Sequence, residues 1–203
     1  LVEKKYEEKR NMLASSYEKA IRDLEIIERK ERLDAIAQFE EFLSRYPDDP
    51  LYSPNVMFRV GELYYERSTD DHTLAMRDYE EVLKKTDPAS GAMPPPEPAV
   101  DFRPSIEIYK KLISKFPAYS NNDGSHYLLG YCLEKQNEFE QGKEAYLTLI
   151  AKYPKSKFAI EAQVRIGEYY FDAFNDPDSL QKAALAYEAA SADVSHPLYD
   201  KAL

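Results

Sequence analysis

The stretch Tyr127–Pro154, YLLGYCLEKQNEFEQGKEAYLTLIAKYP, decides the fold. It consists mostly of helix-forming residues, yet Gly130 and Gly142 lie inside it, and a glycine within a helix costs about 1 kcal/mol relative to alanine. Glycine is favoured there if two helices cross so closely that no side chain fits between them. Tyr146 then fills the neighbouring gap, and Pro154 ends the second helix. The stretch therefore predicts two antiparallel helices in close contact.

The same pattern recurs along the chain. A small residue is followed by an aromatic residue four positions later and by a proline eight positions after that, and two looser copies shift the proline slightly. A second pattern, an aliphatic residue followed by glycine and then by tyrosine or leucine, occurs at residues 60–64, 129–133 and 166–170. Such recurrence predicts a repeat architecture. The copies of the first pattern are Ala35, Phe39, Pro47; Ser105, Tyr109, Pro117; Gly142, Tyr146, Pro154; and, more loosely, Ala75, Tyr79, Pro88 and Ala183, Tyr187, Pro197.

These residues resemble the tetratricopeptide repeat (TPR), whose two antiparallel helices carry a small residue on each at their closest approach. The resemblance covers about residues 33–203 and implies an all-α fold, a right-handed α-solenoid of about 3.5 stacked TPR helix pairs. One departure is that Met57, His126 or Gln163 stands where the family has an early aromatic residue in the first helix.

The N-terminal region predicts one long helix over about 2–31, which has apolar residues at a seven-residue spacing. We interpret residues 1–32 as a capping helix that either shields the first repeat or docks a partner with its apolar stripe. Residues 33–203 form the predicted repeat array, and no strand is expected. Further helices are predicted at 33–46, 54–68, 72–86, 104–116, 124–136, 138–152, 157–174 and 178–192.

A proline-rich segment, TDPASGAMPPPEPAVDFRP at 86–104, interrupts the array. Each interior proline would cost a helix about 3 kcal/mol, so no helix is expected there. We interpret residues 70–103 as an insertion that includes a proline-rich loop over 87–104, with the helix at 104–116 returning as the second helix of its repeat. In the alternative, 72–86 is that second helix and 104–116 is unpaired. The loop is either a solvated linker or a segment that lies along the groove or presents itself to a partner.

Composition excludes several classes of function. The net charge of −10 argues against binding to a phosphate backbone, so no nucleic acid is expected, and no apolar run is long enough to span a membrane. The single cysteine, Cys132, is expected in the core, and His72, His126 and His196 lack the spacing of metal ligands. No phosphate-binding or nucleophile motif occurs. We therefore expect no enzyme activity, no catalytic residue, no metal and no cofactor.

The resemblance also implies a concave groove lined by the first helix of each repeat. Its aromatic and acidic side chains differ from the lysine and asparagine set of TPRs that grip a terminal carboxylate, so a basic and apolar protein or peptide segment is the expected partner. In the alternative, the same aromatic residues only pack between repeats. The partner-binding candidates are Asn55, Phe58, Glu62, Tyr65, Tyr127, Tyr131, Glu134, Glu168 and Phe171, with Glu66, Gly124, Lys135, Glu161, Val164 and Asp172 at matching positions.

The unit endings SRYP (44–47), SKFP (114–117) and AKYP (151–154) resemble those of bacterial envelope TPR proteins. That branch includes the outer-membrane lipoprotein of β-barrel assembly, the Tol–Pal coordinator and TPR proteins of gliding bacteria. The resemblance implies a non-catalytic scaffold in the periplasm, anchored to the outer membrane by a lipid outside this sequence, which we expect to be a fragment or a processed form. The alternatives are a cytoplasmic TPR chaperone or regulatory adaptor that shields a client peptide, and a TPR appendage of a larger enzyme.

Overall fold

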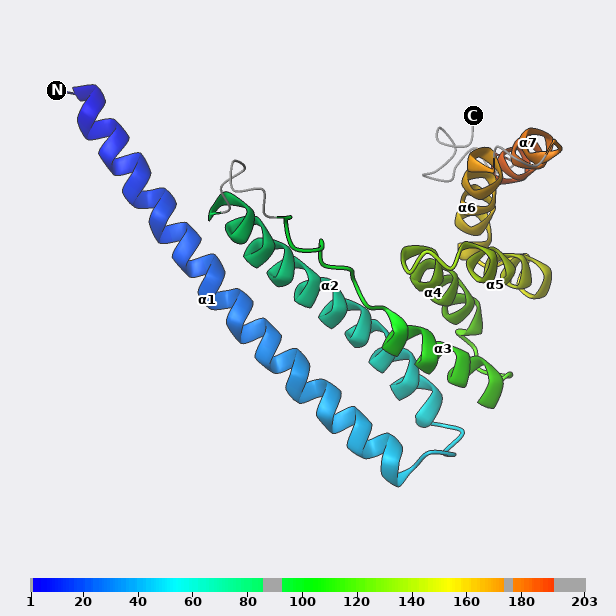
Figure 1. Ribbon diagram of the computed structural model, residues 1–203. Coiled ribbons are helices and arrows are strands. Elements are labelled where there is room, and N and C mark those ends of the chain that lie inside the picture. The colour runs from blue at the N-terminus through cyan, green and yellow to red at the C-terminus, as the bar shows by residue number, and fades with distance from the viewer. Residues whose placement is uncertain (1, 86–92, 174–176, 192–203) are drawn as a thin grey trace.

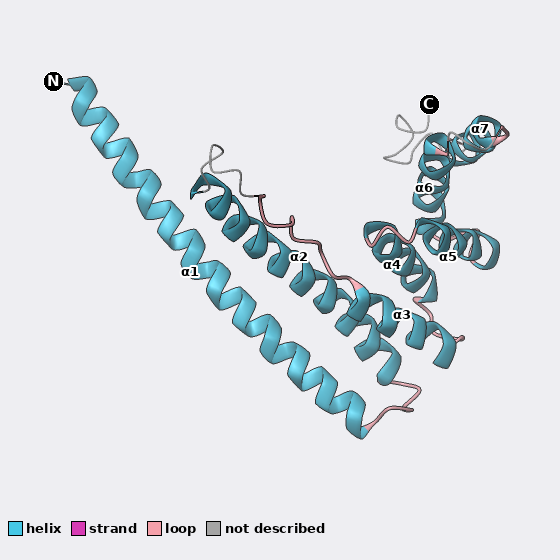
Figure 2. Ribbon diagram, viewed as in Figure 1, coloured by secondary structure: helices cyan, strands magenta, loops and turns pink. Residues whose placement is uncertain are grey.

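The computed structural model describes residues 2–85, 93–173 and 177–191, apart from the side chains of residues 2, 3 and 8. Within these ranges the chain forms helices and no strand, and each helix packs against the next to build a solenoid, which confirms the predicted all-α class (Figure 1, Figure 2). Pro88, His196 and Pro197 lie outside the described residues. The helices are α1 (Val2–Arg45), α2 (Ser53–Lys85), α3 (Arg103–Lys115), α4 (Asn122–Lys135), α5 (Phe139–Lys152), α6 (Phe158–Asp172) and α7 (Ser179–Ala190).

The long N-terminal helix is longer than predicted. The expected helices at 2–31 and 33–46 are one continuous helix, α1, so the predicted break near residue 32 is wrong. No proline or glycine precedes Pro47, and nothing else in the segment stops a helix. The repeat pattern that begins at Ala35 marks the start of packing against α2, not the start of a helix.

The expected helices at 54–68 and 72–86 are likewise one helix, α2. Residues STDD (68–71) lie inside this helix, where the hydroxyl groups of Thr69 and Thr73 donate to the carbonyl oxygens of Tyr65 and Thr69, one turn earlier. Threonine accommodates this back-bonding in a helix interior. Without proline or glycine between Gly61 and Lys85, the helix continues.

An arginine joins α1 to α2. The guanidinium of Arg32 bonds to Glu66 at 3.0 Å, to Asp70 and to Glu28 of its own helix, and its side chain is only 10% exposed. Close by, Ile36 is buried against α2. Charge-assisted bonds of this kind are the stronger class of hydrogen bond, so Arg32 fixes the register of the two helices.

Replacing Arg32 with alanine is expected to lower the free energy of unfolding by about 1–3 kcal/mol, because two partly buried carboxylates on α2 lose their partner. Arg45→Ala is the matched control, since Arg45 and its partner Glu41 are both mostly exposed and such a pair contributes little. Urea denaturation measures both. Equal losses in the two variants would contradict the role assigned to Arg32.

The end of the proline-rich segment runs back along α2 to α3 in extended form (Figure 1). His72 of α2 bonds to the carbonyl oxygen of Pro98 at 3.1 Å. The Phe102 ring is buried and stacks on Tyr65 at 4.9 Å, and the Phe102 amide donates to the side chain of Gln136, just after α4, at 2.8 Å. The part of the segment near Phe102 is therefore packed into the fold. The interpretation of residues 70–103 as an insertion and the division into 1–32 and 33–203 stay predictions.

The glycines mark the closest helix contacts. A Cβ atom added at Gly130 would lie 2.6 Å from a ring carbon of Tyr146, and one added at Gly61 or Gly167 would lie 2.5 Å from the ring of Tyr109 or Tyr187. At Gly142 the same atom would lie 3.1 Å from the Gly130 carbonyl oxygen. The first helix of each pair thus has a glycine at this position, which leaves room for a tyrosine ring of the second helix against its backbone.

Three helices end in the same way, at the aromatic–proline endings. The amide nitrogens of Tyr46, Phe116 and Tyr153 donate to the carbonyl oxygen four residues back, and these are the last such bonds of α1, α3 and α5. The following proline has no amide hydrogen to continue the series. The prolines therefore separate the helix pairs, as the sequence predicted.

Candidate functional site

Three of the aromatic groove candidates lie in ring contacts between helices. Tyr65 stacks on Phe102, Tyr127 stacks on Phe158 at 5.2 Å, and Phe58 lies 6.1 Å from Tyr109 between ring centroids. All three candidates are half-buried and pack against core clusters. Burial, with a contribution from Glu161, raises the pKa of Tyr127 to about 12. The contact of Tyr127 with Phe158 links α4 to α6, and all three rings are partly covered within the fold.

Tyr131 connects this aromatic row to charged side chains. Its ring lies 5.9 Å from Tyr65, and the cationic groups of Arg165 and Lys135 lie 5.3 Å from its centroid. Such contacts contribute about 0.5–1 kcal/mol at exposed sites and hold the cations in place. Two other candidates lie on α2 away from this junction: Asn55 accepts from the Tyr119 hydroxyl, and Glu62 pairs with Arg59.

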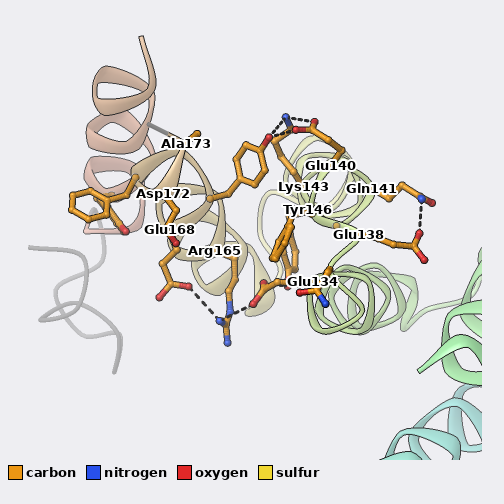
Figure 3. A pocket seen from close by; sticks show the side chains of 16 residues that line it. Glu134, Glu138, Glu140, Gln141, Lys143, Tyr146, Arg165, Glu168, Asp172 and Ala173 are labelled. Carbon is orange, nitrogen blue, oxygen red and sulfur yellow. Dashed lines mark hydrogen bonds and ion pairs between the residues drawn. The ribbon is translucent and has the colours of Figure 1, made fainter. Parts of the chain in front are cut away.

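The remaining candidates, Glu134, Glu168 and Phe171, line one pocket of about 820 Å³ (Figure 3). Its walls are the turn from α4 to α5, the first turns of α5 and the second half of α6. At that turn Asn137 adopts a left-handed conformation with φ 63°, which asparagine tolerates, and this directs the chain from α4 into α5. We call this the carboxylate pocket. Its lining residues are Glu134, Asn137, Glu138, Phe139, Glu140, Gln141, Gly142, Lys143, Tyr146, Arg165, Glu168, Tyr169, Phe171, Asp172, Ala173 and Tyr187.

Arg165 also lines this pocket, although it is not among the residues predicted from the sequence. Its guanidinium bonds to Glu134 and Glu168 at 3.3 Å each, so α4 and α6 are joined by an ion-pair network (Figure 3). A signal for it exists in the sequence, because RVGE at 59–62 and RIGE at 165–168 repeat an arginine two residues before the glycine and an acid one residue after it. In both places the arginine pairs with that acid.

The other basic residue of the pocket is also neutralised. Lys143 pairs with Glu140 at 2.7 Å, bonds to the Tyr169 hydroxyl at 3.3 Å and lies 4.3 Å from the Tyr169 ring centroid. Tyr146 donates its hydroxyl hydrogen to Glu134 at 3.2 Å, and burial followed by the charge of Glu134 raises the pKa of this phenol. The polar groups of this wall are therefore fixed before any ligand arrives.

The charge balance of the pocket is negative. Five carboxylates face two cations in its lining, and neither Glu138 nor Asp172 forms an ion pair with another described residue. Phe139 and Phe171 in its lining are 50% and 56% exposed. Carboxylates beside exposed aromatic rings attract a cationic and apolar ligand.

The side chains that could act as nucleophiles or metal ligands are buried or do not cluster in the described residues. Cys132 is 1% exposed, and burial raises its thiol pKa to about 12, so it is not ionised at neutral pH. Burial, followed by Lys152, lowers the pKa of His126. No group of three or more potential metal ligands occurs among the described residues. No helix within those ranges is both long enough and apolar enough to cross a membrane.

Comparison with known families matches residues 125–156 to the model of the tetratricopeptide repeat. This range contains nearly all of α4, the whole of α5, and the contact of Gly130 with Tyr146. No curated protein matches the chain. The match over 125–156, together with the packing of consecutive helices, supports a protein built on tetratricopeptide repeats.

Proposed function

We propose that this protein is a non-catalytic scaffold that binds a basic and apolar segment of a partner protein in the carboxylate pocket. A tetratricopeptide repeat suggests protein–protein interaction in general, and the pocket gives that role a location. The observation that carries the proposal is the placement of Glu134, Glu168 and Phe171, three predicted groove residues, on a single pocket with excess negative charge.

Two kinds of side chain in the pocket contact different parts of the ligand. Glu138 and Asp172, which lack a cationic partner among the described residues, meet the lysine or arginine side chains of the ligand. Phe139 and Phe171 cover its apolar side chains, and burying such rings supplies most of the affinity of a small interface. Tyr65, Tyr127 and Tyr131, which are half-buried, continue the surface along the first helices.

The test is selection from a random peptide library, followed by charge reversal in the pocket. Peptides rich in lysine or arginine beside aromatic or aliphatic residues are the expected binders. Glu138→Lys combined with Asp172→Lys is expected to weaken their binding by at least about tenfold, because each exchange replaces an attraction with a repulsion. Calorimetry measures the affinities.

Glu144→Lys combined with Glu188→Lys is the matched control, since both are exposed acids outside the pocket lining and give the same change in net charge. This control is expected to retain most of the affinity. A selection that yields acidic peptides, or equal losses in both variants, would refute the proposed use of the pocket.

We further propose that the scaffold works in the bacterial envelope. This is supported by the aromatic–proline endings of α1, α3 and α5, which resemble the envelope branch of the family. Fractionation of native cells tests it: the protein is expected with the periplasm or the outer membrane. Recovery in the cytoplasm would instead support a chaperone or adaptor.

A further inference from the structure

The first half of α1 carries an apolar stripe that nothing in the described ranges covers. Its large members are 54–70% exposed, although residues of these types are usually at least half-buried in a folded protein. Ile21, 54% exposed, lies beside the stripe. Every described side chain from Lys4 to Glu28 is exposed. We call this set the α1 stripe: Tyr6, Leu13, Tyr17, Ala20, Leu24 and Ile27.

The stripe does not face α2. The contacts of α1 with α2 include those of Arg29, Arg32, Ile36 and Glu40, which share one side of the helix. At about 100° per residue, the stripe lies roughly a quarter turn or more away from that side. The stripe is therefore not covered by α2. In addition, the N-terminal end of α1 extends beyond α2 (Figure 1).

The spacing of the stripe is that of a coiled-coil seam. From Leu13 its members follow each other at intervals of four and three residues, which keeps them on one line when two helices wind around each other. A helical segment without tertiary contacts is only marginally stable in water. The first half of α1 thus has the residue spacing of a coiled coil, and a partner helix would stabilise it.

We propose that the α1 stripe binds the same stripe of a second copy of this chain in an antiparallel coiled coil. The area is sufficient. Burying one large apolar side chain removes roughly 100 Å² from water, so the five large stripe members and Ile21 of two copies remove about 1,200 Å². That value reaches the size of a specific protein interface.

An antiparallel arrangement centred between Glu18 and Lys19 fits the residue sizes. In that register Leu13 of one copy lies opposite Leu24 of the other, and Tyr17 lies opposite Ala20. The two-fold axis repeats both layers. Large residues thus meet small ones at the centre, and two leucine layers flank them, which fills the interface evenly. In a parallel pair, Tyr17 would meet Tyr17 and Ala20 would meet Ala20.

Charge favours the same direction. On the same line of the helix, Arg10 lies between Tyr6 and Leu13, and Glu31 follows Ile27. In a parallel pair Arg10 would lie opposite Arg10 of the other copy, and Glu31 opposite Glu31, so like charges would face each other. In the antiparallel register Arg10 and Glu31 lie about one helical turn apart, roughly 6 Å along the axis, within the reach of an arginine side chain. In this register Arg10 lies opposite Ile27 and Glu31 lies opposite Tyr6, so like charges do not meet at these two positions.

Sedimentation equilibrium of the 203-residue chain tests the proposal. A dimer is expected, and Leu24→Glu is expected to weaken its association by at least about 100-fold, because two carboxylates enter the apolar seam. Ile26→Glu is the matched control: Ile26 is 67% exposed on the opposite side of the same turn, and its replacement should leave the dimer intact. Glutamate is a good helix former, so circular dichroism should remain unchanged in Ile26→Glu. Leu24→Glu is expected to lose part of the helical signal, because the first half of α1 then lacks its partner helix.

Oxidation of an equal mixture of Leu13→Cys and Leu24→Cys chains tests the direction. Disulfides between position 13 and position 24 are expected, and Cys132 does not compete because it is buried. Predominant 13–13 and 24–24 disulfides would overturn the antiparallel arrangement. A monomer at all concentrations, or a dimer insensitive to Leu24→Glu, would overturn the proposal. If that monomer floats with phosphatidylethanolamine–phosphatidylglycerol vesicles, lipid covers the stripe instead.

Discussion

Replacing Gly130 with leucine is expected to lower the free energy of unfolding by about 3 kcal/mol or more. The new Cβ alone would lie 2.6 Å from the Tyr146 ring, well inside van der Waals contact. The ring cannot move aside easily, because Tyr146 is 2% exposed and its hydroxyl bonds to Glu134. Thermal and urea denaturation of the chain measure the loss.

Replacing Gly130 with alanine tests the same contact, because the direction of the change in stability distinguishes a crowded position from an open one. In an open helix, Gly130→Ala would stabilise by about 1 kcal/mol through helix propensity. We expect a net loss instead, because its Cβ occupies the same crowded position. Glu144→Leu is the control for added apolar volume: Glu144 is exposed on α5, and its change is expected to stay within about 0.5 kcal/mol.

A double-mutant cycle attributes the effect to one pair. In the background of Tyr146→Ala, Gly130→Leu is expected to cost less than it does alone, because the ring that it displaces is gone. Additive losses would mean that the glycine is required for another reason. Gly167 and Tyr187 have the same geometry, so the result would extend to the next helix pair.

Replacing Phe102 with alanine is expected to cost about 3–5 kcal/mol, the range for deleting a buried aromatic side chain. Phe102 is 4% exposed and stacks on Tyr65, and it lies where the extended segment joins α3. Its removal should also speed protease cleavage around residues 93–102, because the main apolar anchor of that segment is lost.

Met93→Ala is the matched control for this prediction. It shortens an apolar side chain in the same extended segment, but Met93 is 91% exposed, so its effect is expected within about 0.5 kcal/mol. Similar losses in the two variants would show that the segment is not anchored at Phe102. An unchanged cleavage rate in Phe102→Ala would show the same.

Much of the fold was predictable because it depends on local rules. Glycine within a helical pattern has few explanations other than close packing, and Gly130 and Gly142 lie at the predicted contact. Proline cannot continue a helix, so the ends of α3 and α5 near Pro117 and Pro154 follow directly.

The helix lengths were not predictable from the repeat pattern. The pattern records which residues pack, whereas α1 and α2 continue wherever no residue breaks them, far beyond their packed turns. The aromatic groove candidates illustrate a second difficulty. Position in a repeat shows that Tyr65 lies on a first helix, but not that Phe102, which follows a proline-rich segment, covers it. Similarly, Arg165 gains its place through Glu134, which is distant in sequence.

The most direct test of the scaffold proposal is to map a library-selected basic peptide on the protein by hydrogen exchange. Bound peptide is expected to slow exchange in the first turns of α5 and the second half of α6, the walls of the carboxylate pocket. Exchange in α3, which contributes no residue to this pocket, is expected to stay the same. Slowed exchange confined to α1 through α3, with α5 and α6 unaffected, would contradict the account.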